Sequence, residues 1–234
     1  MATTLDLVRA MAQEPLDFEP GTHFQYGLNH DVLGAVIEVV SNMSLGDYFQ
    51  KNIFDVCGMH NTGFGINEDV RSRMCSQYRY VAETGKTELI EKKNEFVLSP
   101  TYQSGGAGLI SCVDDYLKFA TELANGNRLL KKETIDLMRA NHLDGQQHHD
   151  FQDMKPGYSY GLGVRTAINS SFASKEEFGW DGAAGAYVLI DPVEHIAVFY
   201  ATHIRDCVEL LNQTIMCRLR DAVYHIIRTS VSNG

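Results

Sequence analysis

Several features that define common protein classes are scarce or absent in this 234-residue sequence. It holds 5 prolines, and 44% of its residues are hydrophobic, which excludes an intrinsically disordered chain. Its 5 cysteines are odd in number and lack a Cys-x-x-Cys spacing, which argues against a disulfide framework or a zinc site. No apolar stretch approaches the roughly 18 residues of a membrane span. The sequence therefore predicts a soluble globular protein.

Basic residues are also few. The chain has 20 Lys and Arg against 30 Asp and Glu, a net charge of -10 that argues against nucleic-acid and anionic-membrane partners. The first 14 residues lack the apolar core of a signal peptide, so we expect a cytoplasmic protein unless an export signal was lost with a missing N-terminus. No cofactor or metal is expected, because adjacent His148 and His149 diverge and a polar loop explains them better.

The order of patterns along the chain predicts an α+β fold. Apolar spacing indicates helices first, over 5–12, 31–40, 44–57, 111–125 and 132–141. Period-two alternation then indicates antiparallel strands over 158–166, 177–180, 186–190 and 196–202, and a long helix over 208–227 closes the chain. We interpret residues 1–234 as one domain: a mainly helical region (1–157), antiparallel strands (158–204) and a C-terminal helix (205–230).

Two local patterns make specific structural predictions. In the helix over 31–40, four valines, Leu33 and Ile37 cover one broad face, which predicts deep packing. Between the last two strands, Pro192 stands at the second position of a four-residue turn, Asp191 to Glu194, which predicts an antiparallel hairpin.

Five segments together resemble the β-lactamase-related serine hydrolases, which include class C β-lactamases, penicillin-binding proteins and esterases. They occur in the family's order and span most of the chain. They are Phe18–Tyr26 with Asp31–Glu38, Ile53–Phe64, Gly105–Phe119, Tyr160–Val164, and Phe178–Gly185 leading into Ile190–Pro192. Each segment alone is weak because glycine-rich turns are common, and the resemblance to the esterase-like branch is closer. It implies a β-lactamase/transpeptidase-like fold, N-terminally truncated, with an antiparallel sheet flanked by helices.

The resemblance also implies catalytic positions. Family members acylate a serine, move its proton with a lysine and a tyrosine, and stabilise the oxyanion with backbone N–H groups. Tyr26 matches the family tyrosine; a free phenol has a pKa near 10 and needs a neighbouring cation to act as a base. Ala183 N–H is the implied oxyanion donor. The alternative for Tyr26 is an ordinary half-buried tyrosine.

Four further residues are implied to contact substrate: Trp180, Asp181, Gly182 and Asn29. Leu28 occupies the place where the family's tyrosine motif often has asparagine, which puts that amide contact in doubt. Asp181 is unusual, because a carboxylate at this place would repel a developing oxyanion or a carboxylate-bearing β-lactam. The alternative is that 180–182 form only a tight entry to a strand.

The nucleophile is missing from the pattern. No Ser or Thr is followed by Lys three residues later, and no Gly-x-Ser-x-Gly elbow occurs. The first hypothesis is a serine hydrolase of small esters or amides whose Ser-x-x-Lys lies upstream, so that this chain alone is inactive. The second is a non-catalytic binding or interaction protein that keeps the same fold. In either case we expect the strand over 196–202 to be an uncovered edge, through which the chain could form a homo-oligomer.

Overall fold

A computed structural model describes residues 1–92, 99–168, 174–207 and 215–232. The chain divides into two compact units, and each is described by itself. The first comprises Met1–Met74, Lys93–Phe119 and Asp144–Asp150; the second comprises Cys75–Lys92, Ala120–Leu143 and Phe151–Gly234. Helices α6 (Val113–Asn125) and α8 (Gly145–Met154) begin in the first unit and end in the second.

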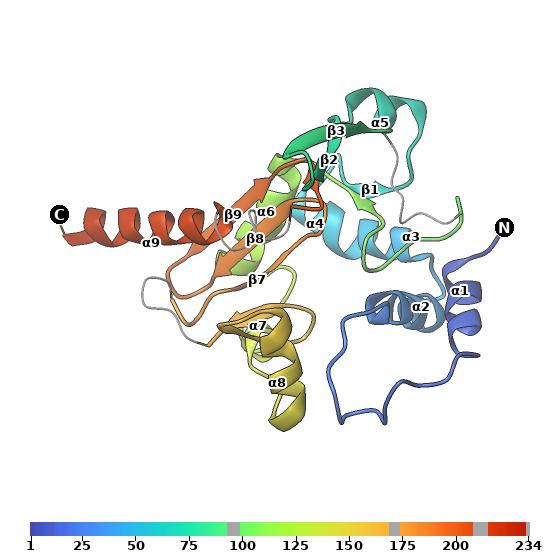
Figure 1. The fold of residues 1–234 in the computed structure, drawn as a ribbon, viewed down its shortest axis with the longest axis horizontal. Coiled ribbons are helices and arrows are strands. Elements are labelled where there is room, and N and C mark those ends of the chain that lie inside the picture. The colour runs from blue at the N-terminus through green and yellow to red at the C-terminus, as the bar shows by residue number, and fades with distance from the viewer. Residues whose placement is uncertain (93–98, 169–173, 208–214, 233–234) are drawn as a thin grey trace. The chain divides into compact units, whose positions relative to one another are not determined.

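The first unit is mainly helical (Figure 1). Its helices are α1 (Thr4–Met11), α2 (Asn29–Ser41), α3 (Leu45–Phe49), the π-helical turn η1 (Gln50–Phe54), α4 (Asp55–Cys57) and α5 (Glu68–Arg73). Two short strands, β1 (Gly63–Phe64) and β4 (Leu109–Ile110), pair antiparallel. Ser44 caps α3, since its hydroxyl accepts a 3.0 Å hydrogen bond from Asp47 N. The helical run ends at Gly58, whose φ of 71° suits glycine.

Helix α2 forms where the sequence predicts it, but the deep packing predicted for it is wrong. Its buried side is made by Asp31, Gly34 and Ala35. Gly34 lets α3 approach closely, because a Cβ there would lie 3.0 Å from a Leu45 methyl carbon. The opposite side exposes Val32, Leu33, Val36, Val39 and Val40, at 36% to 81%. The apolar period identified the helix correctly and misidentified its buried face.

The second unit contains two sheets. The five-stranded sheet runs in the order β5-β6-β7-β8-β9, with every pair antiparallel: β5 (Tyr158–Tyr160), β6 (Arg165–Ala167), β7 (Phe178–Asp181), β8 (Ala186–Asp191) and β9 (Ile196–Ala201). The second sheet has the order β10-β2-β3, with β2 (Gln77–Val81) antiparallel to β3 (Lys86–Ile90) and parallel to β10 (Ile204–Arg205). Figure 1 shows β7, β8 and β9 side by side.

The strand predicted over 158–166 is two strands. The chain turns back after β5, and Gly161 N donates to Val164 O at 2.8 Å. Gly161 fits this turn because a Cβ there would lie 2.2 Å from Met138 O. The period-two alternation continues across the turn, so the sequence pattern does not reveal the break between the two strands. Helix α7 (Lys132–Arg139) ends two residues earlier than predicted.

The hairpin predicted around Pro192 is confirmed, with β8 and β9 paired over six residues. Asp191 Oδ1 accepts from the N–H groups of Val193 and Glu194, both at 2.9 Å. Its other oxygen accepts from the buried Tyr224 hydroxyl at 2.7 Å. Tyr224 lies on α9 (Cys217–Ser232), so this bond ties the final helix to the hairpin. Part of the predicted helix, 208–214, lies outside the described residues.

The observed class is α+β, as predicted, with mainly antiparallel sheets and flanking helices. The core of the second unit gathers Tyr187 and Leu189 of β8, Ile196 of β9, and Met216 and Tyr224 near and on α9. β9 is the last strand of its sheet among the described residues. Within the same residues, no helix has the length and apolar character that crossing a membrane requires.

Candidate active site

Tyr26 lies in the first unit, in the loop that leads into α2, and 55% of its surface is exposed. The loop just before it is held by Asp150. His23 Nδ1 lies 2.9 Å from Asp150 Oδ2, and Phe24 N donates to the same oxygen at 3.0 Å. Hydrogen bonds from Gln146 and from Phe24 N hold the pKa of Asp150 below its ordinary value. A charged acceptor therefore fixes the segment that presents the phenol.

The residues around Asp150 correct a detail of the sequence analysis. His148, His149 and Asp150 were expected in a polar loop, but they lie in helix α8. The segment has few apolar residues, so it carries no helical period, although Phe151 at its centre is fully buried. Among the described residues no group of three His, Cys, Asp or Glu side chains is arranged to hold a metal ion.

Asn29 is the first residue of α2 and is exposed, three positions after Tyr26 in the same unit. Leu28 stands at the N-cap position and provides no side-chain cap. The backbone oxygen of Leu28 accepts hydrogen bonds from Asp31 N at 3.0 Å and from Val32 N at 3.2 Å, which closes the first turn. The structure brings Tyr26 and Asn29 together at the start of one helix.

The other predicted residues lie in the second unit. Trp180 and Asp181 end β7, and a tight turn from Gly182 to Gly185 leads into β8. Gly182 N donates to Ala186 O at 2.7 Å, and Gly185 N donates to Gly182 O at 2.9 Å. Ala183, at the tip, is exposed, and its N–H has no hydrogen-bond partner within the described chain. A donor presented in this way can bind an oxygen atom of a ligand.

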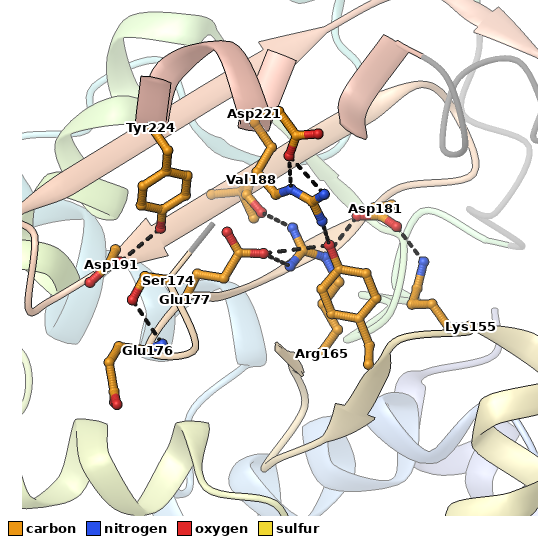
Figure 2. A network of polar contacts seen from close by, with 12 residues as sticks. Lys155, Arg165, Ser174, Glu176, Glu177, Asp181, Val188, Asp191, Asp221 and Tyr224 are labelled. Carbon is orange, nitrogen blue, oxygen red and sulfur yellow. Dashed lines mark hydrogen bonds and ion pairs between the residues drawn. The ribbon is translucent and has the colours of Figure 1, made fainter. Parts of the chain in front are cut away.

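Asp181 is buried, with 8% of its side chain exposed, and both of its oxygens are bound. Oδ1 accepts from Arg165 Nε at 3.0 Å, and Oδ2 pairs with the ammonium group of Lys155. Figure 2 shows the two cations approaching the carboxylate from different segments. Burial alone would raise the pKa of Asp181, but Arg165 and Lys155 outweigh it and hold the pKa below its ordinary value.

This pairing changes the electrostatic expectation for the site. From the sequence, Asp181 is expected to be an unmatched negative charge that repels an oxyanion. The structure places one carboxylate between two cations, so the immediate surroundings of the turn are not negative. Lys155 Nζ also lies 5.4 Å from the centre of the Trp180 ring, whose edge meets Tyr160. The indole is therefore held on two sides.

Arg165 extends the network beneath the turn. Its side chain is 1% exposed and lies between the rings of Tyr158 and Tyr187, 4.8 and 5.0 Å from their centres. It donates to Val188 O at 3.2 Å, and its Nη1 lies 3.6 Å from Glu177 Oε1. Burial raises the pKa of Glu177 although Arg165 opposes this shift.

Lys155, Arg165 and Asp150 were not identified from the sequence. Lys155 and Arg165 lie 26 and 16 residues before Asp181, too far apart for a local motif. One signal was available: an arginine within a strand of aromatic and β-branched residues needs a buried anion, and Asp181 was the unusual acid.

Tyr26 and Asn29 belong to one unit, and Trp180, Asp181, Gly182 and Ala183 to the other. The structure thus brings together the members of each group. That the two groups share one cleft stays a prediction from the family resemblance.

Comparison with known proteins identifies the family. The Beta-lactamase family model matches residues 1–209, so the chain belongs to this family. The chain is 27% identical over 235 residues to Esterase EstB of Burkholderia gladioli, covering 93% of this chain and 58% of EstB. Among solved structures it is similar to EstCE1, a hydrolase with promiscuous acyltransferase activity, with TM-score 0.80 and 27% identity, covering 95% of this chain and 62% of that one.

A third similarity supports the fold alone. Simvastatin synthase of Aspergillus terreus superposes with TM-score 0.81 at 20% identity, covering 96% of this chain and 61% of the synthase. The predicted family and β-lactamase/transpeptidase-like fold are therefore confirmed. The chain spans about half the length of the first curated relatives it matches, 53% of a Mycobacterium tuberculosis protein.

Proposed function

We propose that this chain forms part of a serine ester hydrolase or acyltransferase that works through an acyl-enzyme on small esters or amides. In this proposal Ala183 N–H is one donor of the oxyanion hole, and Tyr26 moves the proton of a serine. That serine belongs to a Ser-x-x-Lys motif outside residues 1–234. The observation that carries the proposal is the exposed Ala183 N–H at the tip of a fixed turn, beside Trp180.

The pairing of the Asp181 carboxylate with two cations supports the same proposal. An oxyanion needs donors and a surrounding that is not negative. Lys155 and Arg165, which also lies 3.6 Å from Glu177, both pair with the Asp181 carboxylate beside the turn. The names of the relatives, an esterase and a hydrolase with acyltransferase activity, favour ester chemistry over β-lactam hydrolysis.

Three of the remaining residues are assigned to substrate contact. Trp180 and Gly182 are assigned to one wall, and the half-buried Trp180 contacts an acyl or alkyl group. Asp181, between them in sequence, has both carboxylate oxygens bound to Arg165 and Lys155, so its side chain is not assigned to substrate contact. Asn29 supplies an amide at the start of α2, displaced by one position from the family's usual asparagine. The proposal includes no cofactor and no metal ion.

The test compares residues 1–234 with a longer polypeptide from the same gene that carries Ser-x-x-Lys. Hydrolysis of short-chain nitrophenyl esters is measured with and without a serine-reactive phosphonate. We expect hydrolysis only by the longer polypeptide, abolished by the phosphonate, and a fall of about 10²–10⁴-fold in kcat for Tyr26→Phe.

Two results would contradict the proposal. Phosphonate-sensitive hydrolysis by residues 1–234 alone would mean that the nucleophile lies within this chain. No hydrolysis by any longer polypeptide would favour the second candidate, a non-catalytic binding protein, for which the missing Ser-x-x-Lys is the specific observation.

We also propose that the outer edge of β9 pairs with another strand, in a second copy of this chain. β9 is the last strand of its sheet in the described part of the molecule, and all six of its residues are apolar or aromatic. Unpaired backbone groups on such an edge recruit another strand. Light scattering tests this: we expect a dimer, which Phe199→Pro converts to monomer, and a wild-type monomer would refute it.

A further inference from the structure

The turn after β7 is fixed firmly at its far end. Gly185 has φ +93°, and a Cβ there would lie 2.4 Å from Thr202 Oγ1, so the backbone packs closely against the residue that follows β9. Thr202 N donates to Gly185 O at 2.8 Å, and the Gly182–Ala186 hydrogen bond closes the loop. The position of the tip therefore depends on how the near end is held.

The near end is held by the side chain of Asp181. This residue stands two positions before Ala183, and each of its carboxylate oxygens binds a different cation. Arg165 comes from the neighbouring strand β6, and Lys155 follows the end of α8. The carboxylate is thus bound to two different elements, one at each oxygen.

Arg165 is itself almost fully buried, with 1% of its side chain exposed. Two tyrosine rings enclose its guanidinium, and its Nη2 bonds to Val188 O on β8. Arg165 therefore bonds both to Asp181, just before the turn, and to Val188 on β8, the strand that follows the turn. Figure 2 shows Arg165, Val188, Asp181 and Lys155 in this arrangement.

We propose that Asp181 is a positioning residue: its double tie to Arg165 and Lys155 sets the direction in which Ala183 N–H points. This inference rests on the proposed function for the role of the N–H, but the geometry stands without it. A purely structural role for Asp181 is the competing explanation. Only the positioning role predicts that loss of the carboxylate changes the turn specifically.

The test uses three variants that remove the ties in steps. Asp181→Asn keeps an acceptor for Arg165 and loses the charge that Lys155 binds. Lys155→Met removes the same tie without changing β7, and Asp181→Ala removes both. Glu122→Gln is the control for loss of a buried carboxylate charge, because the Glu122 side chain is 5% exposed, belongs to the second unit, and pairs with a single arginine, Arg128.

Two spectroscopic signals report on the turn in residues 1–234 themselves. One is the amide of Ala183 in ¹⁵N-alanine-labelled protein; the other is the emission of Trp180, the single tryptophan of the chain. We expect the order parameter of the Ala183 amide to fall from about 0.85 to below about 0.6 in Asp181→Asn and Lys155→Met. Trp180 emission shifts in both variants, and Glu122→Gln leaves both signals unchanged.

A kinetic measurement then uses the longer, nucleophile-bearing polypeptide. A misdirected oxyanion donor weakens only the transition state, so Asp181→Asn lowers kcat by about 10–100-fold with KM unchanged. Unchanged Ala183 and Trp180 signals in Asp181→Asn and Lys155→Met would overturn the inference, as would equal changes in Glu122→Gln. If the signals change but no polypeptide hydrolyses esters, the positioning role stands and the proposed function fails.

Discussion

Helix α2 and the β5–β9 sheet depart from the usual distribution of side chains in opposite directions. α2 exposes Val36, Val39 and Val40 at 51%, 63% and 81%, whereas the sheet buries Arg165 and the adjacent Glu177 at 1% each. Exposed valines lose the stabilisation that burial gives. Buried charges lose their hydration and are tolerated only where partners replace it.

The two regions differ in whether the described residues offset these costs. Arg165 meets two carboxylates, two aromatic rings and a backbone oxygen, all within the second unit. The valines of α2 face solvent on the side away from Asp31, Gly34 and Ala35. An unusual buried charge thus signals a network of partners within its own unit, in which Arg165 Nη1 and Glu177 Oε2 are buried atoms left without a hydrogen bond among the described residues. An apolar surface stripe signals a contact surface or an aggregation site.

Removing the centre of the charged network should have the largest effect. Arg165→Met keeps much of the volume but leaves Asp181 and Glu177 without their shared cation, so we expect a loss of about 3–5 kcal/mol in the free energy of unfolding. Urea denaturation measures it. Arg73→Met is the control, because Arg73 pairs with Asp69 at the exposed surface, and its cost should stay below about 1 kcal/mol. Equal losses of stability in Arg165→Met and Arg73→Met would mean that the cost of removing an arginine does not depend on its burial.

The bond between α9 and the hairpin should come next. Tyr224→Phe leaves one oxygen of the buried Asp191 without its donor, and we expect a cost of about 1–3 kcal/mol in urea denaturation. Tyr78→Phe, at a tyrosine that is 39% exposed, should change stability by less than about 0.5 kcal/mol. If Tyr224→Phe were as mild as this control, the hydroxyl would not anchor the helix.

The two buried acids of the network should respond to pH with opposite signs. The pKa of Asp181 is lowered, so its stabilisation is full above the unfolded pKa of about 3.9 and is lost as the pH falls through the folded value. The pKa of Glu177 is raised, so the folded state holds its proton more tightly, and stability declines as the pH rises from about 4.3 through the raised value.

Urea denaturation between pH 3 and pH 8 separates these two contributions. Relative to wild type, Asp181→Asn should become more destabilising as the pH rises from 3 to 5. Glu177→Gln should become less destabilising as the pH rises above about 4. Slopes of the same sign would show that burial does not outweigh the charge of Arg165 at Glu177.

Local rules made the parts of the fold that depend on neighbouring residues predictable. The turn at Asp191 needs only residues two or three positions away, and it was identified. The break at Gly161 was missed, because what requires glycine there is the carbonyl of Met138, an atom distant in sequence. A pattern along the chain does not reveal such a contact.

The candidate site divides in the same way. A motif named Trp180, Asp181 and Ala183, which lie at the end of β7 and in the turn that follows, and their role in a site stays a prediction. The charge around Asp181 depends on Lys155 and Arg165, which are distant in sequence and brought to Asp181 only by the fold. The repulsion expected from the sequence took neither cation into account. Periodicity likewise predicted α2, but the direction its valines face depends on which surfaces surround the helix.

The smallest expected change in stability comes from α2, and it sharpens the contrast with Arg165. Replacing Val36, Val39 and Val40 together by serine should change the free energy of unfolding by less than about 1 kcal/mol, because these side chains are already exposed. Binding of the dye ANS and self-association should fall, since the replaced carbons form the apolar surface. Ala35→Ser, on the buried side of the same helix, should destabilise more than the triple variant. If the triple variant instead unfolds as readily as Arg165→Met, the valines are buried in solution, and the stripe is a covered interface rather than an open one.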